Sequence, residues 1–208
     1  YDSIHDIYSQ IEPLKKRRAG ALSGGMKQKL ALSCALVHQP RVLFLDEPTT
    51  GVDPVSRKEF WQILQRLRET GMTIVASTPY LDEVRQCECI AFINEGKICG
   101  TGTPEHILNQ FKDIFCPEGL TRAEEKKAKD NDDVIVVKDL CKTFGTFHAV
   151  DHISFSVHRG EIFGFLGANG AGKTTAMRML TGLSQPTGGE GTVAWFDVST
   201  QFEDIKRH

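Results

Sequence analysis

The residues best suited to chemistry in this sequence form a glycine-rich segment that ends in a lysine and a threonine. Gly167-Ala-Asn-Gly-Ala-Gly-Lys-Thr174 fits the pattern G-x-x-x-x-G-K-[ST] and stands between an apolar run, 162–166, and a predicted helix. Glycines let successive backbone N–H groups point inward at phosphate oxygens, and the helix adds its positive end. Lys173 can then lie against the β- and γ-phosphates, and the Thr174 hydroxyl can complete a Mg²⁺ shell. The alternative is a glycine-rich turn that fits by chance, which the strand and helix on either side disfavour.

Two carboxylates end another apolar run in the first half of the chain. The run Arg41-Val-Leu-Phe-Leu45 stops at Asp46-Glu47-Pro48. Its continuous apolarity favours a strand covered on both faces, and ligands of parallel sheets bind at the carboxyl ends of the strands. Asp46 could hold Mg²⁺ through water, and Glu47 could orient or deprotonate an attacking water. A strand-ending Asp-Glu-Pro is also a common turn, and a simple phosphate-loop domain places its loop before the carboxylate strand, not after it.

A third candidate is the helix start in Leu22-Ser-Gly-Gly-Met-Lys-Gln28. Read structurally, Ser23 is a good N-cap and nothing more. Read functionally, its hydroxyl and the glycine amides form an anion site that a phosphate can approach closely. The apolar spacing predicts a helix from Ser23 with one face formed by Met26, Leu30, Cys34 and Val37.

Alternating helix and strand signals from Leu22 to Phe111 predict an α/β layered domain that would position these groups. The expected elements are a helix after Asp53-Pro54 with Phe60, Ile63, Leu64 and Leu67 inside, a strand at 72–76, a short helix at 80–86, a hairpin at 94–96 and a helix from 103. The charged stretch 121–133 predicts an interdomain linker, which we place at 112–133. Beyond it we expect strands at 134–137, 147–157, 161–166 and 191–196 and a helix at 173–183.

Composition excludes several classes of protein. The 208 residues carry 25 Lys and Arg against 27 Asp and Glu, a net charge of −2, which gives no electrostatic case for a nucleic-acid partner. No apolar run reaches the length of a membrane-spanning helix. Six cysteines without a spaced CxxC pair favour reduced thiols in a cytoplasmic protein, with Cys87 and Cys89 packing the sheet. The seven histidines show no metal-ligand spacing.

These motifs together carry a family resemblance. LSGGMKQ, followed by LFLDEP and GVDP, resembles the signature, Walker B and D-loop series of the ATP-binding cassette (ABC) transporter ATPases, and GANGAGKTT resembles their Walker A loop. The resemblance covers nearly the whole chain apart from the linker. The order is unusual, because the signature and Walker B precede Walker A.

The resemblance implies an α/β fold of the P-loop NTPase type, with a mainly parallel sheet and an antiparallel β subdomain, and it implies ATP and Mg²⁺ as cofactors. It assigns nucleotide binding to Phe144, Gly167, Ala168, Asn169, Gly170, Ala171, Gly172, Lys173, Thr174 and Thr175. The signature residues would be Leu22, Ser23, Gly24, Gly25, Met26, Lys27 and Gln28. Glu47 would be catalytic, Asp46 and Thr174 would serve Mg²⁺, and Asp53 would lie in the D-loop.

Two of these positions need comment. From spacing alone Phe144 is better interpreted as a core residue, and only the resemblance makes it an adenine-stacking aromatic. Where ABC ATPases usually have a histidine after the strand, Ala76-Ser-Thr-Pro-Tyr80 has Pro79, which offers neither a hydrogen-bond donor nor a titratable group. We therefore expect the site of this cassette to bind ATP and to hydrolyse it slowly.

The motif order admits two arrangements. In the first, 1–111 is the C-terminal half of one ATPase domain and 134–208 is the N-terminal half of a second, as an internal piece of a tandem-cassette drug-efflux ATPase. Asp46 and Glu47 would then serve a different site from Lys173, and the chain alone would be inactive. In the second, the halves fold on each other as one permuted cassette. Lys173 close to Asp46 would support the permuted form, and Ser23 facing Gly167 the tandem form.

The resemblance implies that the full-length protein hydrolyses ATP to drive a membrane transporter, and that the direction of transport is export. Its partners would be membrane-spanning subunits and a second ABC ATPase domain, with no nucleic acid, and it would lie at the cytoplasmic face of the inner membrane. The rival readings are an ABC ATPase that acts on ribosomes or DNA, and a non-hydrolysing regulatory cassette, which Pro79 favours.

Overall fold

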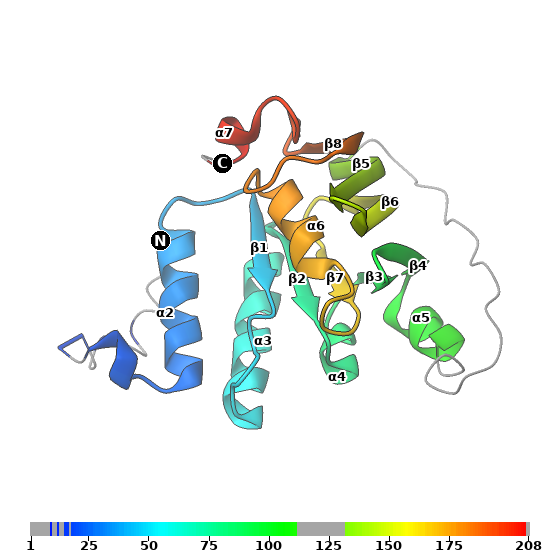
Figure 1. The fold of residues 1–208 in the computed structure, drawn as a ribbon. Coiled ribbons are helices and arrows are strands. Elements are labelled where there is room, and N and C mark those ends of the chain that lie inside the picture. The colour runs from blue at the N-terminus through cyan, green and yellow to red at the C-terminus, as the bar shows by residue number, and fades with distance from the viewer. Residues whose placement is uncertain (1–8, 10–11, 13–14, 17, 112–131, 207–208) are drawn as a thin grey trace.

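The fold is a mixed α/β arrangement of two sheets with flanking helices, and the expected α/β class is confirmed (Figure 1). The computed structural model describes residues 9, 12, 15–16, 18–111 and 132–206. Most of the segment predicted as a linker, 112–131, lies outside the described residues, as does Cys116.

The larger sheet has five strands in the order β1-β2-β7-β3-β4. Their bounds are Val42–Asp46 for β1, Thr73–Thr78 for β2, Ile162–Leu166 for β7, Cys89–Asn94 for β3 and Lys97–Gly102 for β4. The strands run parallel except for β4, which pairs with β3 as an antiparallel hairpin. Strand β7 comes from the second half of the chain, yet both of its neighbours come from the first half. The two halves therefore share one sheet.

The smaller sheet is antiparallel, with the order β6-β5-β8-β9. Its strands are β5 at Asp133–Phe144, β6 at Phe147–His158, β8 at Gly188–Val193 and β9 at Phe196–Asp197. All four belong to the second half of the chain, so this sheet is the expected antiparallel subdomain.

The helices begin where the sequence supplies caps. The described ones are η2 (Ala19–Ala21), α2 (Gly24–Leu36), α3 (Pro54–Glu69), α4 (Leu81–Val84), α5 (Pro104–Gln110), α6 (Lys173–Leu180) and α7 (Phe202–Ile205). Asp53 accepts a hydrogen bond from the Ser56 N–H at the start of α3, and Thr103 caps α5 in the same way, each with proline next. Within the part of the chain that is described, no helix has both the length and the apolarity to cross a membrane.

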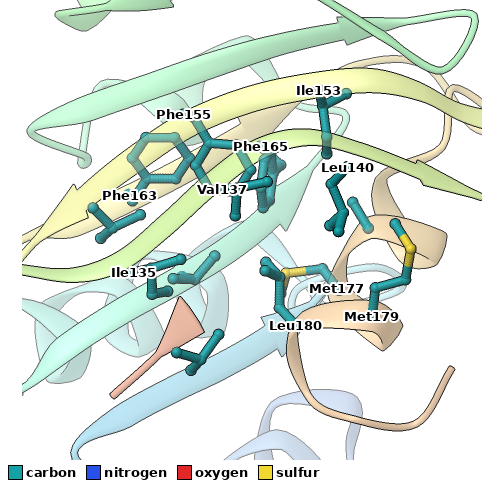
Figure 2. Close-up of a cluster of buried hydrophobic side chains, with 14 of the residues drawn as sticks. Ile135, Val137, Leu140, Ile153, Phe155, Phe163, Phe165, Met177, Met179 and Leu180 are labelled. Atoms are coloured by element: carbon teal, nitrogen blue, oxygen red, sulfur yellow. The ribbon is translucent and has the colours of Figure 1, made fainter. Parts of the chain in front are cut away.

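Apolar side chains of both halves form the core. In Figure 2 the smaller sheet packs on the larger one through Phe155, which stacks on Phe163 at 5.4 Å and meets the edge of Phe165 at 5.2 Å between ring centroids. Met177 and Leu180 of α6 close the same cluster. A second cluster joins the buried face of α3 to β2, β3 and α5. Burial on both faces explains the continuous apolar strands.

Several predicted elements need correction. In α2 the predicted face is wrong, because the buried residues are Gly25, Leu32, Ser33 and Leu36, whereas Cys34 and Val37 are exposed. The small residues Gly25 and Ser33 belong to the buried face, and a prediction from the spacing of apolar residues does not include them. Strand β5 begins at Asp133, inside the predicted linker, and extends well past residue 137, because β6 and β8 pair with it on both sides.

Candidate nucleotide-binding site

The base of the phosphate loop is held so tightly that only glycine fits. The loop leaves β7 at Gly167, where an added Cβ would lie 2.3 Å from the Ile93 carbonyl oxygen. It enters α6 after Gly172, which has φ +108° and where a Cβ would lie 2.5 Å from the Ala149 carbonyl oxygen. Real Cβ atoms do not approach so closely, so these two glycines let the loop pack against the end of β3 and against β6.

The rim of the same loop is open. Ala168, Asn169 and Gly170 are exposed, and a Cβ at Gly170, where φ is +83°, would meet no atom within 4 Å. The Ala171 N–H donates to the Ala168 carbonyl at 3.2 Å and closes the turn. The loop is thus a packed base with a free rim, the shape that a phosphate cradle needs.

Lys173 is the buried cation of the site. Only 2% of its surface is exposed, and its Nζ donates to the carbonyl oxygens of Gly167 and Ala168, both at 2.9 Å. The Nζ also lies 3.2 Å from Glu47 Oε1. The buried ammonium therefore has a carboxylate partner from the first half of the chain, as a buried charge requires.

Asp46 and Glu47 leave the end of β1 in different directions. The chain turns at Glu47, which has φ +46°, and its N–H donates to Ser77 Oγ at 2.9 Å. The Ser77 hydroxyl in turn donates to Asp46 Oδ1 at 2.5 Å, because β1 and β2 pair with Asp46 opposite Ser77. One carboxylate is therefore fixed on Ser77 and the other on Lys173. Ser77 was not a sequence candidate, since nothing in its spacing distinguishes it from a core strand residue.

A buried glutamate fixes the segments that follow β1 and β2. Glu83 is 2% exposed and accepts hydrogen bonds from Thr49 Oγ1 at 2.5 Å and Thr78 Oγ1 at 2.6 Å. Arg57 Nε of α3 lies 3.5 Å from Glu83 Oε1. This network joins the residues after Glu47, the end of β2 and the start of α3, and no spacing motif in the sequence pointed to it.

Pro79 follows β2 directly and is half-buried. The next residue, Tyr80, donates its N–H to Thr78 Oγ1 at 3.0 Å, and the Arg57 guanidinium lies over the Tyr80 ring at 4.5 Å. The turn is thus held by Thr78 and Arg57, and position 79 supplies no polar hydrogen to the site.

The signature segment packs against the start of α3. Ser23 Oγ accepts a hydrogen bond from the Met26 N–H at 3.3 Å, as the predicted N-cap. A Cβ on Gly25 would lie 2.6 Å from Ser56 Cβ, so α2 and α3 meet closely beside Asp53. The Ser56 N–H lowers the pKa of the Asp53 carboxyl. The buried apolar residues of α2 belong to the cluster that contains α3, whereas those of α6 belong to the cluster on which the smaller sheet packs.

Phe144 lies at the tip of the β5–β6 hairpin. Its side chain is 56% exposed, and Lys142 Nζ lies 5.2 Å from the centroid of its ring. The interpretation of Phe144 as a core residue is therefore wrong, because a hairpin tip has no layer above it. The ring is accessible for stacking.

The site thus combines parts from both halves of the chain. Lys173 from the second half of the chain meets Glu47, the residue after Asp46, from the first half. In the described residues, no group of three or more His, Cys, Asp or Glu side chains could hold a metal ion by itself. A Mg²⁺ ion here would need oxygen ligands from a phosphate in addition to Thr174 and Asp46.

Comparisons with known proteins agree with this reading of the motifs. The family model described as ABC transporter matches residues 4–50 and 150–208, about half of the chain. The "Probable multidrug ABC transporter ATP-binding protein YbhF" of Escherichia coli is 34% identical over 279 positions, which cover 97% of this chain and 48% of that protein. The "Doxorubicin resistance ATP-binding protein DrrA" of Mycobacterium tuberculosis is 40% identical over 102 residues, 49% of this chain and 31% of that protein.

Among solved structures, cbiO1 from Clostridium perfringens, described as part of the ABC transporter complex cbiONQ, matches with a TM-score of 0.47 and 30% identity. The match covers 55% of this chain and 47% of that one. The chain spans about half the length, or less, of the curated relatives it matches. The two separate family segments contain the signature with Walker B and the Walker A loop, respectively. On the strength of the family match, this chain belongs to the ABC transporter family, as part of an ATP-binding domain.

Proposed function

We propose that this chain binds MgATP at the phosphate loop 167–175 and that, in its full-length protein, it belongs to an ATPase that drives a membrane transporter. The observation that supports this most is the contact of 3.2 Å between Lys173 Nζ and Glu47 Oε1. A phosphate-loop lysine beside a strand-terminal carboxylate supports the proposal, because this is the combination that phosphoryl chemistry needs.

The residues present fit the nucleotide. The open rim at Ala168 to Gly170 leaves room for phosphate oxygens at the backbone amides, and Lys173 would contribute a charge-assisted hydrogen bond. The Thr174 hydroxyl and Asp46 would hold Mg²⁺, and Phe144 would stack on the adenine ring. Glu47 would orient or deprotonate the attacking water, a role that requires it to release Lys173 to the phosphates.

The motif order supports a tandem origin. We propose that 1–111 derives from the C-terminal half of one ATPase domain and that 134–208 derives from the N-terminal half of the next. In the full-length protein Glu47 and Lys173 would then serve two different sites, although they meet in this chain. The alignment with the multidrug relative runs over 279 positions, more than this chain contains, so that relative has additional residues within the matched region. Much of the segment that an ABC ATPase has between Walker A and the signature is missing here, and we expect the chain alone to be inactive in hydrolysis.

The partners and location follow from the same proposal. The full-length protein would act with membrane-spanning subunits and with a second ABC ATPase domain, at the cytoplasmic face of the inner membrane. Export is the direction that the names of the multidrug and doxorubicin-resistance relatives favour. Pro79 supports a second candidate, a cassette that binds ATP and regulates its partner with little hydrolysis of its own.

Binding of MgATP to this chain, measured by isothermal titration calorimetry, tests the proposal. We expect Lys173→Ala to weaken binding by about 10- to 100-fold, because a hydrogen bond to a charged group contributes about 1.5–3 kcal/mol. Lys58→Ala, which removes an exposed lysine of α3, is the matched control and is expected to bind as the unmodified chain does.

The result must be separated from loss of structure, because Lys173 is buried and partners Glu47. Circular dichroism of Lys173→Ala at the titration temperature provides that check. A folded Lys173→Ala variant that binds MgATP as tightly as the Lys58→Ala control would refute nucleotide binding at this loop.

A further inference from the structure

A polar cavity opens at the end of the sheet opposite to the phosphate loop. It has a volume of about 510 Å³ and is lined by Arg41, Thr70, Thr73, Val134, Arg159 and Trp195, among others. Arg41 immediately precedes β1 and Thr73 begins β2, whereas Asp46 and Thr78 end these strands. At about 3.3 Å per residue, a strand of this length separates the two ends by roughly 16 Å. The cavity is therefore distinct from the nucleotide site.

Trp195 lines this cavity although its backbone conformation is unfavourable for a bulky residue. It lies in the tight turn between β8 and β9, where Val193 pairs with Phe196. Both central residues have positive φ, +48° at Ala194 and +73° at Trp195. Such turns favour Asn-Gly, and a bulky residue in the left-handed region is strained. The indole is nevertheless 60% exposed, so burial in the core does not explain its presence.

Two arginines line the cavity together with Trp195. The Arg41 guanidinium carbon lies 5.2 Å from the centroid of the Trp195 ring, a cation–π contact. Arg159 lines the same cavity, and both arginines are exposed. Within the described residues neither guanidinium forms an ion pair with a carboxylate. Their positive charges are therefore available to an anion.

We propose that this cavity binds a small organic anion in which a phosphate or carboxylate group is attached to a planar ring. Guanidinium groups recognise the planar fork of a carboxylate or phosphate with paired hydrogen bonds. The exposed indole face provides the contact area for the ring. The volume is within the usual range for small-molecule sites. Arg41 comes from the first half of the chain and Arg159 and Trp195 from the second, so the site forms only where the halves share the sheet.

The two tryptophans of the chain make the binding position directly observable. The indole N–H signals of Trp195 and of Trp61, which is buried in α3, are two separate reporters in a ¹⁵N–¹H correlation spectrum. Phenyl phosphate and benzoate serve as ring-bearing anions, phenol as the neutral ring and inorganic phosphate as the anion without a ring. We expect both ring-bearing anions to shift the Trp195 signal in a saturable way and to leave the Trp61 signal in place. Phenol and phosphate should bind at least tenfold more weakly.

Variants locate the interaction on the proposed groups. Arg159→Ala and Arg41→Ala are each expected to raise the dissociation constant at least fivefold, whereas Arg66→Ala, an exposed arginine of α3, should leave it unchanged. Trp195→Gly relieves the positive φ, so its melting temperature should be at least that of the unmodified chain. Its affinity, followed at the Gly71 amide that lines the cavity, should fall at least fivefold.

A Trp195→Gly variant that is at least as stable but binds more weakly would indicate that Trp195 is retained for binding. The proposal fails if neither anion shifts the Trp195 signal at millimolar concentration. It also fails if phenol or inorganic phosphate alone binds as tightly as the ring-bearing anions, or if Arg159→Ala binds phenyl phosphate as tightly as Arg66→Ala does. The Trp195, Trp61 and Gly71 signals do not report on the Walker A loop. Nucleotide binding at that loop therefore neither supports nor weakens the proposal for the cavity.

Discussion

At the scale of single residues, the geometry of the site depends on the hydrogen-bond donors that individual side chains supply. Ser77 provides a hydroxyl that fixes Asp46, and Thr49 and Thr78 satisfy the buried Glu83. Each of these groups is paired, and these hydrogen bonds fix the segments after β1 and β2 relative to each other. Pro79 is the exception, because it has no N–H and no polar side chain.

The missing donor at position 79 leads to a kinetic prediction. In the full-length protein, Pro79→His is expected to raise ATP turnover at this site at least tenfold, since a positioned general acid or base typically contributes about 10²–10⁴-fold. Pro79→Ala is the matched control, because it restores the backbone N–H without an imidazole. Phosphate release at saturating MgATP measures both variants.

Equal turnover of Pro79→His and Pro79→Ala would show that the imidazole has no role here. A second outcome would also count against slow hydrolysis. In the unmodified full-length protein, the site that contains Pro79 would already hydrolyse ATP as fast as the site of the second cassette.

At the scale of elements, the contact between α2 and α3 involves the signature glycine Gly25. An added Cβ at Gly25 would lie 2.6 Å from Ser56 Cβ and 2.7 Å from Ser56 Oγ. Alanine is a better helix former than glycine by about 1 kcal/mol, so propensity alone predicts that Gly25→Ala stabilises α2. The contact predicts the reverse, because overpacking costs about 1–3 kcal/mol.

We therefore expect Gly25→Ala to lower the free energy of unfolding by about 1–2 kcal/mol in urea denaturation. Adding Ser56→Gly removes the blocking atoms, and in a double-mutant cycle it should recover most of the loss. Gly20→Ala is the control, since a Cβ there meets nothing within 4 Å. A Gly25→Ala chain as stable as the Gly20→Ala chain would mean that α2 moves away from α3 at no cost.

The elements also show which features a sequence can predict. Caps and turn residues act locally, so Asp53-Pro54 and the Glu95-Gly96 turn predicted α3 and the β3–β4 hairpin correctly. The buried face of α2 was predicted wrongly because close packing selects Gly25 and Ser33, which carry no apolar signal. Helix α7 has only four residues, too few to show a periodicity, and was missed.

In the candidate site, the sequence indicates only the groups that form contiguous motifs. Walker A and the strand-terminal carboxylates are contiguous in sequence, so their spacing could be recognised. Ser77 and Glu83 act through contacts that join residues more than thirty positions apart, to Asp46 and Thr49 respectively. No local pattern encodes such contacts, and the register of β1 against β2 creates the one between Ser77 and Asp46.

At the scale of the whole molecule, the position of β7 determines how the halves depend on each other. Ile74 of β2 lies opposite Ile162, and Cys89 of β3 lies opposite Phe163. Without β7, the edges of β2 and β3 would lose their partners and the larger sheet would divide. Each half of the chain therefore lacks a complete sheet of its own, and we expect neither to unfold independently.

The tryptophans allow this to be tested, since Trp61 belongs to the first half and Trp195 to the second. In Trp195→Phe the fluorescence reports only Trp61, and in Trp61→Phe it reports only Trp195. Within each variant, we expect the urea transition seen by fluorescence to superimpose on that seen by far-ultraviolet circular dichroism, which follows the whole chain. Comparison within one variant is necessary, because replacing the buried Trp61 itself changes stability. Fluorescence transitions separated from the dichroism transition in either variant would mean that the halves fold as independent units, as parts of two tandem cassettes would.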